Sequence, residues 1–260
     1  MSEEVAVFID IENIRYGLLN EYGQEPDFSY LIDKAKKYGR PTVMKAYADF
    51  SEHPPDLTRQ LQICGIEAIN VPVKRRMVKD STGKAVERVK NAADMVLALD
   101  AIMKAIEADN QKKSKTFLIV SGDRDYVRLV ALLRQRFAQE VVICGIPGAV
   151  SADLERAANI LDNFEVKKSA PVNSLDIKKG IVKMLLRGPS PLDYWSMKII
   201  DDWSQNPRQA IPGTAKEKRD ALSALKDENV IICKEIDDPK RGKRMAASLD
   251  EGEARKKGYI

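Results

Sequence analysis

Histidine is almost absent from this 260-residue sequence, since His53 is the only one. A lone imidazole excludes metal sites built from several histidines and acid–base pairs of two histidines. Cysteine is also scarce: the three residues are Cys64, Cys144 and Cys233, without CxxC spacing. Their odd number and wide separation argue against a disulfide framework or a structural zinc site. Any hydrolytic chemistry must therefore use carboxylates, lysines or metal-bound water.

Long apolar segments are missing as well. No apolar run approaches the roughly 18 to 20 residues that a membrane-spanning helix needs. The first ten residues, MSEEVAVFID, lack the basic start and the long apolar stretch of a secretory signal. We therefore expect a cytoplasmic protein without membrane attachment. The net charge of +4 lies in residues 169–260, because residues 1–168 are neutral. Such a mild charge permits nucleic-acid binding without requiring it.

Short apolar runs alternate with helical patterns in the first two thirds of the chain. Apolar runs without a polar face are typical of strands buried on both sides of a parallel sheet. The sequence therefore predicts an α/β domain with a doubly wound, mainly parallel, five-stranded sheet. The predicted strands are 5–9, 41–48, 66–73, 116–120 and 140–145. The predicted helices are about 29–38, 54–64, 91–107 and 124–137, with one more over 151–165 that Ser151 would cap.

A polar, proline-containing stretch near residue 170 marks a domain boundary. We predict one domain over residues 1–168 and a second, small and mostly helical, over 172–260. In the second, helices are predicted over 175–187, 192–204 and 214–229, followed by a hairpin of 230–236 and 244–248. This order is that of a winged helix. Residues 250–260 are charged and are expected to fray.

Acidic residues follow two of the predicted strands directly. Asp10 ends the first run, while Asp123 and Asp125 follow the fourth in SGDRD. Ligands of parallel sheets bind beyond the carboxyl ends of the strands. Asp94 lies near the start of the 91–107 helix, so its place at the same rim is permitted but not forced. Clustered carboxylates repel unless a divalent cation neutralises them, and such a cation activates water for phosphodiester hydrolysis.

A simpler interpretation is open for each of these acids. An aspartate after a strand often caps the next helix, so Asp10 and Asp123 are also candidate N-caps. Lys90 is predicted on the same helical face as Asp94, four residues away. It forms either a surface salt bridge with Asp94 or a contact to a scissile phosphate. Asp100, further around the helix, is expected to be structural.

The segments FIDIENI (8–14), KNAADMVLALDAI (90–102) and SGDRDYVRLV (121–130) resemble the NYN domain family, a branch of the PIN-like ribonuclease fold. The resemblance covers roughly residues 3–166. It implies a Mg²⁺- or Mn²⁺-dependent ribonuclease site, with Asn13 and Ser121 as supporting polar groups. The metal-binding acids that it implies are Asp10, Asp94, Asp123 and Asp125. One departure is Asn159, where the family often has an aspartate.

Residues 74–90 carry seven basic and two acidic side chains around the turn sequence DSTG. We predict a basic hairpin or loop over the acidic rim that binds the phosphates of single-stranded or structured RNA. Its candidate contacts are Lys74, Arg75, Arg76, Lys79, Lys84 and Arg88. A solvated surface loop is the alternative. A winged helix would add contacts from its third helix (Lys216, Lys218, Arg219 and Lys226) and from its wing (Lys240, Arg241, Lys243 and Arg244).

The sequence thus favours a metal-dependent endoribonuclease. The alternative is a non-catalytic regulator that binds RNA or a protein, with homodimerisation or protein docking through the second domain. A hydrolase with Asp10 as nucleophile ranks lower, because position 12 is Glu12 where an aspartate is expected.

Overall fold

The computed structural model describes residues 4–79, 85–90, 92–166, 172–187, 194–206, 209–238 and 242–260. The chain divides into two compact units, which are described separately below. The first comprises residues 1–17 and 25–166, and the second comprises residues 18–24 and 167–260. No helix in the described parts of the chain has the length and apolar character that crossing a membrane would require.

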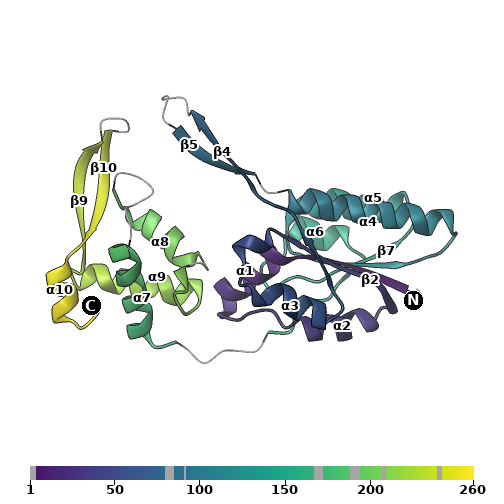
Figure 1. The fold of residues 1–260 in the computed structure, drawn as a ribbon, viewed down its shortest axis with the longest axis horizontal. Coiled ribbons are helices and arrows are strands. Elements are labelled where there is room, and N and C mark those ends of the chain that lie inside the picture. Colours follow the sequence, from purple (N-terminus) through teal and green to yellow (C-terminus); the bar gives the residue numbers. More distant parts are fainter. Residues whose placement is uncertain are drawn as a thin grey trace. The chain divides into compact units, whose positions relative to one another are not determined.

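The first unit is built on a six-stranded parallel sheet with the strand order β3-β2-β1-β6-β7-β8 (Figure 1). The strands are β1 (Glu4–Asp10), β2 (Arg40–Ala48), β3 (Glu67–Asn70), β6 (Thr116–Val120), β7 (Glu140–Ile143) and β8 (Ile160–Leu161). The doubly wound α/β prediction is confirmed, with one strand more than the five expected. Residues 5–9 and 116–120 are fully buried, as their continuous apolar character requires.

The extra strand replaces part of a predicted helix. Residues 151–165 do not form one helix, because helix α6 (Ala152–Ala157) is short and strand β8 follows it. Asn159 causes the change: its N–H donates to the Val141 carbonyl, and its side-chain oxygen accepts from the Val141 N–H, both at 2.9 Å. These bonds hold the backbone extended beside β7. Ser151 precedes α6 without a side-chain capping bond.

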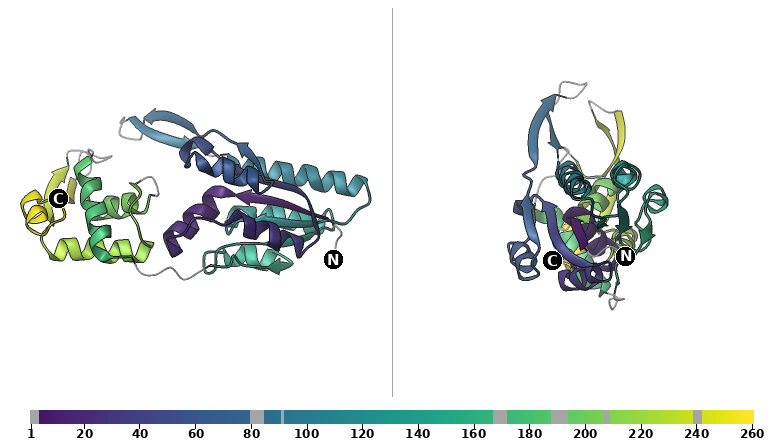
Figure 2. Two further views of the ribbon diagram at one scale, coloured as in Figure 1. Left: turned by 60° about the horizontal axis from the view of Figure 1, so that its bottom comes forward. Right: turned by 90° about the vertical axis from the view of Figure 1, so that its right-hand side faces the viewer.

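Helices cover both faces of the sheet (Figure 2). Alternate residues of β1, Ala6 and Phe8, pack against α4 and α5 in one apolar cluster. On the other face α2 contacts β1 and β2. The helices are α1 (Ile11–Tyr22), α2 (Phe28–Lys36), α3 (Asp56–Ile63), α4 (Ala93–Asn110) and α5 (Val127–Gln135). The four predicted helices are present, and α1 is an addition that directly follows the strand ending at Asp10.

The basic segment forms the predicted hairpin. Strands β4 (Lys74–Lys79) and β5 (Ala85–Lys90) pair antiparallel as a two-stranded sheet of their own. Figure 1 shows this ribbon extending away from the six-stranded sheet. The register pairs Lys74 with Lys90 and Arg76 with Arg88. Positions opposite one another in such a ribbon share a face, so four basic positions occupy one face of the hairpin. Lys84 lies outside the described residues.

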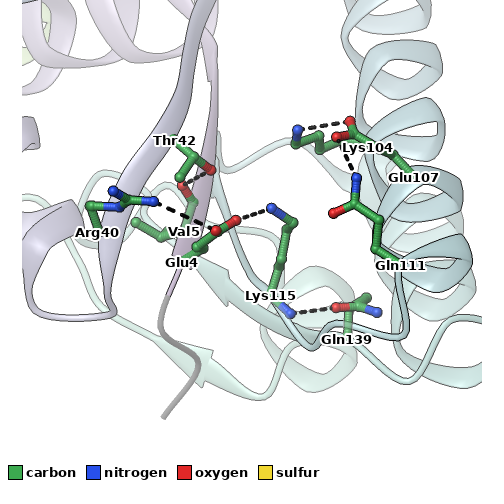
Figure 3. Close-up of polar contacts among 9 residues, drawn as sticks. All are labelled: Glu4, Val5, Arg40, Thr42, Lys104, Glu107, Gln111, Lys115 and Gln139. Carbon is green, nitrogen blue, oxygen red and sulfur yellow. Dashed lines mark hydrogen bonds and ion pairs between the residues drawn. The ribbon is translucent and has the colours of Figure 1, made fainter.

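The amino-terminal edge of the sheet has its charges paired (Figure 3). Glu4, the first residue of β1, forms ion pairs with Lys115 and, at 3.7 Å, with Arg40. The Lys115 side chain is buried, and its backbone N–H donates to the Gln139 side chain at 2.7 Å. These contacts hold the starts of β1 and β2 and the segment before β6 together, and they match the charges of Glu4 and Lys115.

The second unit has three helices followed by a hairpin, in the predicted order. These elements are α7 (Ser174–Arg187), α8 (Met197–Gln205), α9 (Ala215–Asp227), β9 (Ile231–Asp238) and β10 (Gly242–Leu249). Trp195 and Trp203 meet edge to face, with ring centroids 5.5 Å apart, and pack against the apolar core. The expectation that 250–260 frays is wrong. Asp250 caps a further helix, α10 (Glu251–Lys256), by accepting from the Glu253 N–H at 3.0 Å, and Ala254 is buried.

Candidate active site

Asp10 is the last residue of β1 and the polar centre of the sheet's carboxyl edge. Its Oδ1 accepts from the Asn13 N–H at 3.1 Å, which caps α1. Its Oδ2 accepts from the Tyr126 hydroxyl at 3.1 Å and from the Ser121 hydroxyl at 3.4 Å. The carboxylate is thus held from three directions: by the helix that follows it, by the strand beside it and by the turn beyond that strand.

The turn after β6 is tied to the same place. Asn13 uses its side-chain oxygen to accept from the Gly122 N–H at 2.9 Å. Ser121, which donates to Asp10, accepts from the Asp123 N–H at 3.2 Å. Asp123 in turn accepts from the Asp125 N–H at 3.1 Å and caps the short helix Arg124–Tyr126. Asn13 and Ser121, the predicted supporting groups, therefore join the ends of β1 and β6.

Gly122 is required here by a close approach of backbone. A Cβ at this position would lie 2.9 Å from the Ala149 carbonyl oxygen and 3.2 Å from the Val150 Cα. The Ser151 N–H donates to the Gly122 carbonyl at 3.0 Å, which holds the 145–151 segment against the turn. The glycine at this position is therefore explained by backbone contact with the loop after β7.

The electrostatics of the site are dominated by unpaired negative charge. Burial raises the pKa of Asp10 above its ordinary value, and the neighbouring Asp123 charge adds to the rise, while bonds from Asn13, Tyr126 and Ser121 oppose it. Burial also raises the pKa of Tyr126, followed by the charges of Asp10, Asp94 and Asp123. Tyr126 is therefore a neutral donor within electrostatic reach of three of the four predicted acids.

The sheet order explains why these residues meet. From β1 the chain winds outward through β2 and β3, and from β6 it winds outward in the opposite direction through β7 and β8. The β1–β6 junction is therefore the topological switch point, where the loops leaving the two strands diverge and where parallel sheets commonly bind ligands. Ile9 pairs with Val120 across this junction, so Asp10 and Ser121 are the first residues beyond it.

Asp10 is the most buried of the four predicted acids, because the other three are exposed. Asp94 lies in the first turn of α4, Asp123 caps the short helix after β6, and Asp125 lies within that helix. In the described part of the chain, none of the four acids forms an ion pair with a lysine or arginine. Nor do three or more His, Cys, Asp or Glu side chains there form a group that could hold a metal ion.

The donor set nevertheless suits a hard cation with a hydrated shell. Magnesium commonly binds proteins through one or two carboxylates and keeps several waters. Asp10 and Asp123, two neighbouring carboxylates whose charges disfavour each other, meet that requirement with oxygen ligands alone. Asp94 supplies a third negative charge near Tyr126. The residues therefore fit Mg²⁺ or Mn²⁺, although they do not form a closed cage.

Lys90 corrects a sequence prediction. It does not lie on the helix of Asp94, because it is the last residue of β5 and α4 begins only at Ala93. The i,i+4 relation assumed from the sequence does not exist, since the β-hairpin continues to the edge of the helix. Asp100 accepts from Lys45 and from the Tyr47 hydroxyl, both at 2.8 Å, and is structural as expected.

Tyr126 is not among the residues predicted from the sequence. Its signal was present, because it follows SGDRD at the point where the turn gives way to the apolar pattern of α5. An aromatic residue there is usually a packing group, and Tyr126 does pack, with only 2% of its surface exposed. Its hydroxyl bond to Asp10 depends on the sheet order, which the sequence pattern does not specify.

Comparison with known proteins agrees with this arrangement. A family model described as the NYN domain matches residues 4–162. A crystal structure of a protein of unknown function from Vibrio parahaemolyticus is similar, with a TM-score of 0.52 and 25% sequence identity. The similarity covers 63% of this chain and 94% of that chain. No curated protein matches the chain.

Proposed function

The chain belongs to the NYN domain family, and on that premise we propose that it is a divalent-metal-dependent endoribonuclease that hydrolyses RNA phosphodiester bonds. The observation that carries the proposal is the pairing of Asp10 with Asp123 at the β1–β6 switch point. A half-buried carboxylate beside a second, exposed carboxylate, with no ion-pair partner among the described residues, suits a bound cation.

Capping alone does not account for the two aspartates. Each does cap a helix, since Asp10 accepts from the Asn13 N–H and Asp123 from the Asp125 N–H. An asparagine caps about as well as an aspartate and carries no charge. Placing two charged caps against each other at a partly buried site raises the pKa of Asp10 and works against stability. A function that needs negative charge, such as binding a cation, explains why both positions carry aspartate.

Asp10 and Asp123 would hold the ion, with Asp94 nearby and Asp125 outermost. The chemistry that Mg²⁺ or Mn²⁺ would supply there, when bound, is a water molecule of lowered pKa and stabilisation of the leaving oxygen of the phosphodiester. Tyr126 and Ser121 orient the Asp10 carboxylate by donating to its Oδ2. Asn13 fixes the distance between the two strand ends through its bond to the Gly122 N–H.

The substrate would reach this edge from the β4–β5 hairpin. Lys74, Arg75, Arg76, Lys79 and Arg88 occupy its two strands, and Lys84 lies between them in the sequence. The hairpin leads directly into α4 and hence to Asp94. Basic positions so close in sequence to an acidic site suit contacts to the backbone phosphates of RNA.

The test is cleavage of labelled single-stranded RNA by the full chain in Mn²⁺ or Mg²⁺. Asp123→Asn keeps the capping oxygen and removes only the charge, so we expect cleavage to fall on the order of a hundredfold or more with the fold intact. Asp94→Asn is expected to lower it less. Asp109→Asn, an exposed acid at the far end of α4, is the matched control and should cleave normally. Normal cleavage by Asp123→Asn would refute the assignment.

A non-catalytic RNA-binding regulator is the second candidate. The absence of a three-carboxylate metal group among the described residues favours it. The two functions separate in the same assay: retained RNA binding without turnover in either metal, on single-stranded and structured RNA alike, would support the regulator.

A further inference from the structure

Three of the cations expected to bind nucleic acid in the second unit are buried or held in ion pairs. Lys218, on α9, is buried with 4% of its surface exposed, and burial lowers its pKa. Arg219 lies 3.5 Å from Asp201, and Lys243 of β10 lies 2.9 Å from Glu235. Lys240 and Arg241 fall outside the described residues. The prediction that Lys218 contacts nucleic acid is therefore wrong, because its position turns into the core of this unit.

A different helix carries cations that are free. Lys179, Lys183 and Arg187 of α7 are all exposed, and they follow one another at intervals of four residues. That spacing places them in one row along the helix, about 6 Å apart for each step at 1.5 Å per residue. Among the ion pairs between described residues, none involves any of the three, whereas Lys178 beside them pairs with Glu228 at 2.5 Å.

The row borders a groove rather than a flat helix surface. Lys179, Lys183 and Arg187 line a hollow of about 480 Å³ together with the segment Gln209–Pro212. Its remaining lining on α7 is Asp176, Gly180 and Met184. Three cations against one acid leave the groove with net positive charge.

The groove has a fixed wall, because its two sides pack tightly. A Cβ on Gly180 would lie 3.1 Å from the Ile211 side chain, so α7 and the 209–212 segment are already in close contact. Ile211 is buried with 6% of its surface exposed and belongs to the apolar core of the unit. Ala210 holds a positive φ of 51°, which turns the segment alongside the helix.

We propose that this groove binds the sugar–phosphate backbone of single-stranded RNA, with Lys179, Lys183 and Arg187 contacting successive phosphates. A row of unpaired cations at regular intervals suits a linear polyanion better than a single phosphate group. The exposed apolar ring of Pro212 suits the sugars and bases between the phosphates. The choice of RNA as the polyanion rests on the proposed ribonuclease function, and the groove would hold substrate apart from the cleavage site.

The experiment measures binding of a labelled single-stranded RNA to the full chain, by fluorescence anisotropy in chelator so that no cleavage occurs. The test variant combines Lys179→Gln, Lys183→Gln and Arg187→Gln. The matched control removes the same number of exposed cations elsewhere in the second unit, by Lys198→Gln, Lys234→Gln and Lys257→Gln. We expect the α7 variant to lose about tenfold or more in affinity at low salt. The magnitude of its slope of log affinity against log salt should fall by about 2, as three phosphate contacts at about 0.7 each require.

The control variant should change affinity less than twofold. Equal losses in the two variants would overturn the proposal, because they would mean that total charge and not the α7 groove governs binding. Unchanged affinity in the α7 variant would overturn it as well. Lys179→Arg with Lys183→Arg keeps the charges and should bind normally, and thermal unfolding must match that of the unaltered chain, so that a folding defect is not mistaken for lost contacts.

Failure of this proposal and failure of the ribonuclease are separable. Binding in chelator does not depend on hydrolysis, and cleavage measured at saturating RNA does not depend on the affinity that α7 supplies. If the chain cleaves RNA with metal and the α7 variant binds RNA normally, only the groove proposal fails. If the α7 variant loses binding and the chain does not cleave RNA, only the ribonuclease proposal fails.

Discussion

Two places in the molecule carry charged side chains without partners of opposite sign among the described residues. At the carboxyl edge of the β1–β6 pair the unpaired charge is negative, and in the row Lys179, Lys183 and Arg187 of α7 it is positive. Several other charged residues in the described part of the chain are matched at close range. Examples are Lys34 with Asp162 at 2.5 Å, Lys45 with Asp100 at 2.8 Å and Lys178 with Glu228 at 2.5 Å.

The two ends of β1 differ in the same property, which is whether their carboxylates have cationic partners. Glu4 at its start meets Lys115 and Arg40, whereas Asp10 at its end meets hydrogen-bond donors and another carboxylate. The first arrangement stabilises the fold. The second lowers stability unless a cation arrives, so it identifies the end of the strand where a ligand is expected.

The largest expected effect comes from Asp10→Asn, which separates activity from stability. RNA cleavage should fall on the order of a thousandfold. Because the folded-state pKa of Asp10 is raised, its carboxylate destabilises the fold at pH values above that pKa, and the penalty disappears as the pH falls through it. An uncharged asparagine should therefore raise the Tm at pH 7 in chelator. A lower Tm would show that the charge stabilises the fold and would contradict the contrast.

Gly122→Ala should follow, with a loss of about 3 kcal/mol in the free energy of unfolding and reduced cleavage. Its new methyl group meets the Ala149 carbonyl at 2.9 Å, and backbone does not move aside easily. Gly180→Ala, in the second unit, is the comparison. There the methyl meets Cγ2 of Ile211 at 3.1 Å, a milder contact than the one at Gly122, and alanine favours the helix, so a loss below about 1 kcal/mol is expected. Denaturant unfolding measures both, and equal losses would contradict the assignment of Gly122 to a backbone constraint.

His53 gives a smaller effect that depends on pH. Its ring stacks on Tyr16 with centroids 5.5 Å apart, its Nδ1 lies 3.4 Å from Arg15, and its Nε2 is buried without a hydrogen-bond partner. Burial, and then the Arg15 charge, lower its pKa from 6.5 to about 4. Its neutral form therefore supports the fold above pH 6.5, and that support is lost as the pH falls toward 4.

The loss between pH 7 and pH 5 should be about 2 kcal/mol from this residue. His53→Phe keeps the ring and cannot be protonated, so its unfolding midpoint should depend less on pH in that window. Parallel pH profiles for the unaltered chain and for His53→Phe would show that the acid sensitivity arises elsewhere.

Much of the first unit followed from sequence because its signals are local. Apolar runs ending in aspartate predicted both the buried strands and the acids beyond them, since strands of a parallel sheet present their ends at one edge. The two-residue strand β8 is too short for any periodicity, and it depends on the paired bonds of Asn159 with Val141.

Charged residues away from the strand ends were harder to place. The sequence places Lys90 on a helix because local composition does not show where the hairpin ends. That end depends on the pairing of β5 with β4, which is a long-range contact. Lysines are almost always exposed, so the sequence favours an exposed Lys218. In the structure Lys218 is buried on the inner face of α9, as are Ala221 and Leu222. The row on α7 was hidden because its significance depends on which neighbouring cations already have partners.

The central claim is that the unmatched negative charge at the β1–β6 switch point exists to hold a divalent cation. Calorimetric titration of the full chain with Mn²⁺ tests it directly, with Asp123→Asn beside Asp109→Asn. The account predicts binding to the unaltered chain and to Asp109→Asn, and loss of that binding in Asp123→Asn. Equal Mn²⁺ affinity in all three proteins would contradict it.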